Sequence, residues 1–206
     1  YLTYGRKAHP IALKETYGFH LAMALDHAFF CDAESGSSNA RILRTSRDFI
    51  SQCENTDELI VVIGWSTWER EEWEYKNQYY NVNSSGHDQL PDELQKQYKQ
   101  WVTKQTQKTL NKKSKYWHTE IYKLHQLLER ESIPHVFFNC MYNFFNARYH
   151  YPWNNCYIGP YENDLSYYQW LKAQGATADE WYHYKTDGHQ LWAKRIIDYI
   201  KENKIL

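Results

Sequence analysis

The residues best suited to chemistry lie close to the C-terminus. Asp179 and Glu180 precede His183, and Asp187 follows it. A loop histidine with a carboxylate three or four residues upstream is a usual arrangement for an oriented general base. The carboxylate fixes the imidazole tautomer and stabilises the imidazolium that forms during proton transfer. This pattern favours His183 as a catalytic base. The alternative is a structural histidine, with Asp187 capping the helix that follows.

Signals for strands and helices alternate along the chain and predict the elements that position these residues. Strands are predicted over 1–5, 59–64 and 133–139, and helices over 14–30, 39–53, 92–130, 164–175 and 188–203. This alternation predicts an α/β fold, a three-layer α/β/α sandwich with a short parallel sheet and flavodoxin-like layering. Ligands of such sheets bind at the carboxyl ends of the strands. The segments expected around that mouth are 5–9, 36–39, 64–70 and 139–146.

Four sequence blocks follow one another along the chain. They are a strand ending in Gly5, the turn Gly36-Ser37-Ser38-Asn39, a strand ending in Gly64, and His183 before Gly188-His189-x-x-Trp192-Ala193. In this order, the blocks resemble the SGNH (GDSL-like) hydrolases, and most closely a divergent branch from phages and marine microbes. The resemblance covers nearly the whole chain. It implies the SGNH-hydrolase fold and ester hydrolysis, with His183 as triad base and Glu180 or Asp179 as its acid. It also implies an oxyanion donor at the Gly36 amide, with the Asn39 side chain nearby.

Two blocks depart from the family pattern. The family places its serine nucleophile after the first strand, where this chain has Lys7 in Gly5-Arg6-Lys7. The third block reads Gly64-Trp65-Ser66-Thr67, without the family's oxyanion asparagine. A lysine at the nucleophile position cannot accept the acyl group of an ordinary acyl-enzyme mechanism. The nucleophile position is therefore degenerate.

Three interpretations follow. The fold has lost its hydrolase chemistry and binds a ligand or partner, or another hydroxyl is the nucleophile, or His183 activates water while Arg6 and Lys7 hold a phosphate or carboxylate. The candidate hydroxyls are those of Ser37, Ser38, Ser66 and Thr67. We therefore expect an SGNH-hydrolase-like protein with residual or altered ester or phosphoester hydrolysis. The alternative is a non-catalytic binding protein, such as a phage-encoded accessory or virion component.

Further side chains could contact a substrate at the same mouth. They are those of His9, Trp65 and Arg70. His9 could join His183 and Asp187 around a metal ion, but their spacing is not typical of a metal site. The four cysteines also show no CxxC or zinc-type spacing, so they are expected to be free thiols in a reducing compartment. We expect no metal and no cofactor.

Composition limits the remaining classes. The chain has 206 residues, enough for a single domain, with a helical and aromatic insertion expected at about 66–130. Its formal net charge of −1 argues against nucleic-acid binding and against polybasic membrane docking. Aromatic residues make up 17 %, which suits a small-molecule or carbohydrate ligand if they line a cleft, and a satellite core if they pack together. We expect a cytoplasmic protein, in the host cytoplasm if phage-encoded, with a virion location as the alternative.

Overall fold

The computed structural model describes residues 3–4, 13–84, 90–144, 146–180 and 183–206. Within them the helices and strands follow one another in mixed order. They are β1 (Thr3–Tyr4), α2 (Tyr17–Ala24), β2 (Phe29–Phe30), α3 (Asn39–Gln52), β3 (Val61–Trp65), β4 (Glu71–Tyr75), β5 (Gln78–Val82), α4 (Asp92–Thr103), α5 (Gln107–Arg130), β6 (His135–Asn139), β7 (Tyr157–Ile158), the 3₁₀ turn η1 (Asn163–Leu165), α6 (Tyr167–Ala173) and α7 (Thr186–Asn203).

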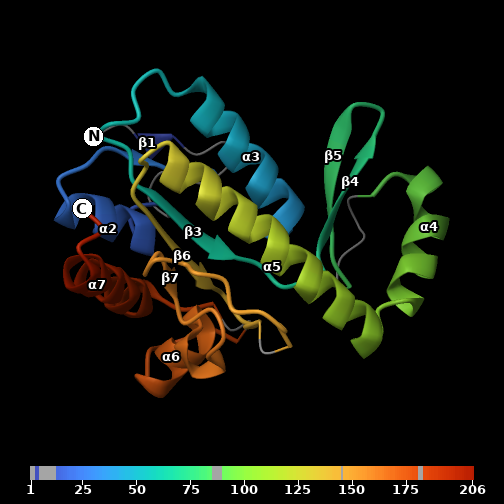
Figure 1. Ribbon diagram of the computed structural model, residues 1–206. Coiled ribbons are helices and arrows are strands. Elements are labelled where there is room, and N and C mark those ends of the chain that lie inside the picture. The colour runs from blue at the N-terminus through green and yellow to red at the C-terminus, as the bar shows by residue number, and fades with distance from the viewer. Residues whose placement is uncertain (1–2, 5–12, 85–89, 145, 181–182) are drawn as a thin grey trace.

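A three-stranded parallel sheet in the order β3-β6-β7 forms the centre of the molecule (Figure 1). The central strand β6 is buried along its whole length, as its apolar sequence predicts for a strand covered on both faces. β1 and β2 form a separate parallel pair. The class predicted from the sequence, α/β with a short parallel sheet, is therefore confirmed.

Helices cover both faces of this sheet. On one face, α3 and α5 pack against Ile63, Trp65 and Phe137. On the other face, α2, α6 and α7 pack against Val136 and Phe138. Alternate residues of a strand point to opposite faces, so β6 supplies side chains to both cores.

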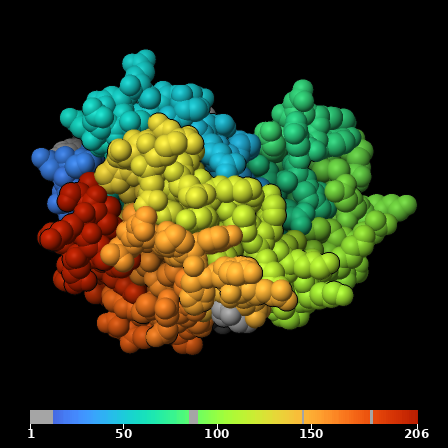
Figure 2. All heavy atoms as spheres, viewed as in Figure 1, coloured from blue at the N-terminus to red at the C-terminus, as the bar shows by residue number. Residues whose placement is uncertain are grey.

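A satellite unit stands beside the main body. The antiparallel hairpin β4–β5 packs on α4 through a small core of its own, Val82, Leu90, Leu94 and Tyr98, with Trp73 and Trp101 against it. Figure 2 shows this unit, in green, as a lobe at one side. Of the two alternatives for the aromatic residues of this segment, the satellite core holds for Trp73, Tyr75, Tyr80, Tyr98 and Trp101, whereas Trp68 lies in the main core. Helix α5 lies within the predicted insertion, but it packs in the main core.

Several predicted boundaries are wrong. The helix expected over 14–30 ends at Ala24, because Asp26 adopts a left-handed conformation (φ 55°) and the chain then enters β2. The helix expected over 92–130 is two helices, since Thr106 caps α5 by accepting from the Thr109 N–H. The hairpin β4–β5 and the short strand β7 are absent from the predicted elements. The two residues of β7 are too few to show a period, and the largely polar side chains of β4 and β5 give little periodic signal.

Cys31, Cys53, Cys140 and Cys156 are free thiols in the structure. Across the described residues, no helix combines the length and apolarity needed to cross a membrane. The polar character of the long helices is clear in α5, where one face carries the buried residues and the other carries lysines. Such a face is typical of a helix that lies between a core and water.

Candidate functional site

Asn39 joins two of the predicted blocks at the carboxyl edge of the sheet. Its Nδ2 donates to the Ser66 carbonyl at 3.1 Å, and its Oδ1 accepts from the Ser66 N–H at 2.8 Å. The side chain is fully buried. Asn39 therefore positions the loop after β3 against the start of α3. The Asn39 side-chain amide, which was expected near an oxyanion, already makes these two hydrogen bonds to Ser66.

The serines of the second block also have structural roles. Ser38 is fully buried and caps α3, its Oγ accepting from the Arg41 N–H at 3.2 Å. Ser37 is buried, and its hydroxyl donates to the Glu34 carbonyl at 2.7 Å. Gly36 before them has a φ of 78°, in the left-handed region where glycine is favoured. These contacts make Ser37 and Ser38 poor nucleophiles, because neither hydroxyl is free to meet a substrate.

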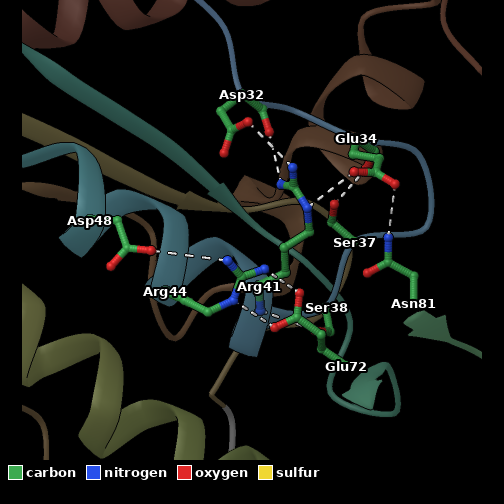
Figure 3. A network of polar contacts seen from close by, with 9 residues as sticks. All are labelled: Asp32, Glu34, Ser37, Ser38, Arg41, Arg44, Asp48, Glu72 and Asn81. Carbon is green, nitrogen blue, oxygen red and sulfur yellow. Dashed lines mark hydrogen bonds and ion pairs between the residues drawn. The ribbon is translucent and has the colours of Figure 1, made fainter. Parts of the chain in front are cut away.

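A network of ion pairs holds this turn and the hairpin in place (Figure 3). The buried Arg41 guanidinium contacts the Asp32 carboxylate at 3.3 Å and the Glu34 carboxylate at 3.2 Å. One turn further along α3, Arg44 makes a two-pronged contact with Glu72 of β4, at 3.0 and 2.6 Å. Charged pairs of this fork geometry fix orientation as well as distance. The network thus sets where α3 begins and where the satellite unit attaches.

The third block divides into buried residues and one cationic side chain. Trp65 was expected to bind substrate, but it is fully buried in the main core against Phe137. That prediction is wrong, because the alternation of β3 turns Trp65 inward. Thr67 is buried as well, and among the described residues its Oγ1 has no hydrogen-bond partner.

Arg70 is the cationic group at this edge. Its Nη1 donates to the Ser66 Oγ at 3.2 Å, which occupies that hydroxyl. The guanidinium also lies near Cys140, where burial raises the thiol pKa to about 12 and Arg70 opposes the shift. Within the described ranges, no carboxylate lies within ion-pair distance of Arg70. Among the described residues, Arg70 is thus a cationic side chain bonded to Ser66 and not to a carboxylate.

His183 lies on a short hairpin just before α7. The Asp179 carboxylate accepts from the His183 backbone N–H at 2.8 Å, and its second oxygen lies 3.3 Å from the ring Nδ1. The hairpin is closed by the bond from the Asp179 N–H to the His183 carbonyl. Of the two predicted acids, Asp179 makes this contact, and Glu180 is exposed. The His183 side chain is 77 % exposed, so its Nε2 can be reached from solvent.

Two hydrogen bonds anchor this hairpin at the carboxyl edge. Tyr184, next to His183, donates its hydroxyl to the Tyr168 carbonyl, and the Tyr168 N–H donates to the carbonyl of Cys140, directly after β6. The other end of α7 lies at the amino edge, where Lys204 lines a cavity with His135. The start of α7, and His183 before it, therefore border the same edge as Asn39, Ser66 and Arg70.

The positions Gly5, Arg6, Lys7 and His9 lie outside the described residues. The structure brings Asn39, Ser66 and Arg70 together through direct contacts, whereas Ser37 and Ser38 bond to Glu34 and Arg41. Within the described part of the chain, no hydrogen bond joins His183 to any of the candidate hydroxyls. The edge thus holds an oriented histidine and a cation, with its described serines engaged elsewhere.

Sequence reasoning missed one cluster of potential ligand atoms. His125 on α5, His135 on β6 and Cys156 just before β7 meet at the amino edge and show no motif spacing.

No family model, curated protein or solved structure matches this chain, so the function is argued from the geometry of its sites.

Proposed function

We propose that this chain is an SGNH-hydrolase-like protein in which the Asp179–His183 pair acts as general base in the hydrolysis of an ester or phosphoester by water. The observation that carries the proposal is the double contact of Asp179 with His183, through the backbone N–H and through Nδ1. This contact fixes the tautomer that leaves Nε2 as proton acceptor. The block order from Gly36 to Ala193 supports the family assignment and the SGNH-type sandwich.

The steps follow from these groups. Nε2 of His183 takes a proton from water, the resulting hydroxide attacks the ester carbon or phosphorus, and the imidazolium returns the proton to the leaving alkoxide. Arg70 meets the developing negative charge, since a guanidinium matches the oxygens of phosphate or carboxylate. Water is favoured over a serine because Ser37 and Ser38 are buried and hydrogen-bonded to the chain.

A second candidate is a non-catalytic binding protein that uses the same edge. The observation in its favour is that the described hydroxyls of this edge are either engaged, as for Ser37, Ser38 and Ser66, or buried, as for Thr67. In that case Arg70 and the exposed His183 would bind an anionic ligand without turnover. Hydrolysis kinetics, together with a ligand-binding assay, distinguish the hydrolase from the non-catalytic binding protein.

The first experiment measures hydrolysis of activated carboxylic esters and phosphodiesters. We expect His183→Ala and Asp179→Asn each to lower kcat by about 10²–10⁴-fold, the range for loss of an oriented general base. Glu180→Gln is the matched control, because it removes a neighbouring carboxylate that does not contact the ring, and it should keep full activity. If wild type and His183→Ala hydrolyse every substrate equally slowly, the protein is not a hydrolase of this class.

Arg70→Met tests the anion-binding role, with the exposed Arg47→Met as its control. We expect Arg70→Met to raise KM for phosphodiesters by about tenfold and to change KM for neutral esters little. An equal loss for both substrate types would assign Arg70 to the structure of the loop rather than to the ligand.

A further inference from the structure

Two buried histidines meet at the amino edge of the sheet, opposite the edge described above. His125 lies on α5 and His135 is the first residue of β6, and they are 0 % and 2 % exposed. Cys156 lies directly before β7. The ligand atoms that the three residues offer all lie within 4.8 Å of one another.

The outer nitrogen of each ring faces groups that can only accept hydrogen bonds. His135 Nδ1 is 2.9 Å from the Ile133 carbonyl. His125 Nε2 is 3.2 Å from the Pro152 carbonyl and 3.3 Å from a carboxylate oxygen of Glu129. Carbonyl and carboxylate oxygens are acceptors, so both outer nitrogens carry a proton. A neutral imidazole has only one ring proton, and each ring has therefore used it.

The inner nitrogens are consequently left as two lone pairs that face each other. His125 Nδ1 and His135 Nε2 are 2.8 Å apart. This approach is favourable only if a positive charge is shared between them. A third proton would supply it, but burial disfavours a charged imidazolium.

A metal ion would supply the same charge with more partners. Two imidazole nitrogens and one thiolate are a ligand set that zinc prefers. Tetrahedral zinc with ordinary zinc–nitrogen bonds needs the two nitrogens roughly 3.3 Å apart. The rings would thus separate by about half an ångström. Glu129, at the outer nitrogen of His125, provides the carboxylate–histidine–metal arrangement that orients metal-bound histidines.

We propose that His125 Nδ1, His135 Nε2 and Cys156 Sγ form a binding site for a divalent transition-metal ion of the zinc type. A cavity of about 260 Å³ beside them, lined by Glu129, His135, Asn154, Cys156 and Lys204, leaves room for a water as fourth ligand. Binding replaces the Cys156 thiol proton with the metal and releases that proton to solvent. The ion ties α5 to β6 and to the segment that leads into β7.

The experiment titrates the chelator-treated full chain with Co²⁺ as a spectroscopic probe. We expect one Co²⁺ per chain, with the visible bands of tetrahedral cobalt and a near-ultraviolet thiolate-to-cobalt charge-transfer band, both abolished by added Zn²⁺. Cys156→Ser should remove the charge-transfer band. Cys53→Ser is the matched control, since that thiol also donates to a backbone carbonyl two residues away, and it should keep the band.

Two further variants sharpen the result. His135→Asn should remove a ligand and abolish tetrahedral binding, and Glu129→Gln should weaken Co²⁺ affinity by about tenfold through the orientation of His125. If His135→Asn fails to fold, Cys156→Ser and Glu129→Gln still decide the matter.

Two outcomes would overturn the proposal. One is the absence of a charge-transfer band in wild type at saturating Co²⁺, and the other is a band that persists in Cys156→Ser. An imidazolium signal for His125 or His135 at neutral pH by ¹⁵N NMR, unchanged by Zn²⁺, would assign a shared proton to the site instead.

Discussion

The two edges of the β3–β6–β7 sheet treat their buried polar groups in different ways. At the carboxyl edge Asn39 and Ser66 are paired with each other, and Ser37 and Ser38 have fixed partners, while Thr67 Oγ1 has none among the described residues. At the amino edge, His125 and His135 turn bare lone pairs toward each other. A buried polar group with fixed hydrogen-bond partners stabilises the fold. A cluster of ligand atoms whose lone pairs lack hydrogen-bond partners is instead a candidate binding site.

Helix α5 shows the same contrast within a single element. His118 and His125 lie about two turns apart and are both buried. The Tyr161 hydroxyl accepts from the Tyr151 N–H and the Trp153 Nε1–H, so its own proton goes to His118 Nε2 at 3.1 Å. His118 is therefore a neutral ring, and its Nε2 accepts a hydrogen bond from the Tyr161 hydroxyl. His125 has no such neutral arrangement, because its partner His135 presents a lone pair.

The largest expected effect comes from breaking the matched pairing at the carboxyl edge. Asn39→Ala leaves the buried N–H and carbonyl of Ser66 without their partners, and each such loss costs about 1–3 kcal/mol. We expect a decrease of about 2–5 kcal/mol in the free energy of unfolding, measured by urea denaturation. Asn55→Ala is the control, since Asn55 accepts one backbone N–H in an exposed turn. A loss for Asn39→Ala no larger than for Asn55→Ala would contradict the positioning role.

The next largest effect is the dependence of folding stability on pH that the titration of His118 causes. Burial, and then the nearby His150, lower the His118 pKa from 6.5 to about 4. As pH falls below about 6.5, the unfolded chain takes up a proton that the folded chain refuses, so stability decreases down to about pH 4. The contribution is about 3 kcal/mol, at 1.36 kcal/mol per pKa unit.

The measurement is the slope of unfolding free energy against pH between 4 and 6.5, taken from urea titrations. His118→Phe should reduce that slope by about one proton. Tyr161→Phe removes the hydroxyl that His118 accepts from but keeps the titrating ring, so its slope should remain. An unchanged slope in His118→Phe would mean that other groups carry the acid sensitivity.

The smallest effect concerns the attachment of the satellite unit to α3. Glu72→Gln removes the charge from the two-pronged contact with Arg44. Because Arg44 is 34 % exposed, solvent screens the pair, and we expect a loss of only about 1 kcal/mol. Limited proteolysis should cut the hairpin β4–β5 faster in this variant, with Glu74→Gln on the same strand as control. Equal cutting rates would show that the core around Val82 and Tyr98 holds the unit alone.

The long apolar and periodic segments of the chain could be predicted from sequence. The runs that became β3 and β6, and the stripe on α7, bury themselves in any compact structure. Helix α3 was predicted over 39–53 and spans Asn39–Gln52, because its apolar residues recur at helical spacing. The hairpin β4–β5 was not, since its polar strands are held by Arg44 and α4 rather than by their own pattern.

The candidate site divides in the same way. The His183 loop and its upstream carboxylates could be found by spacing along the chain. The choice of Asp179 over Glu180 could not, because it depends on the turn that closes the hairpin. The burial of Trp65 depends on which face of β3 it occupies.

By itself the sequence determined the α/β class and the bounds of α3, since these follow from hydrophobic patterns along the chain. Only the tertiary structure decided which polar groups are matched. His125, His135 and Cys156 lie in successive segments of the chain and come together because α5 packs on the sheet beside β6 and β7. Hydrogen-bond partners and lone pairs are set by distances in space, which a linear pattern does not contain.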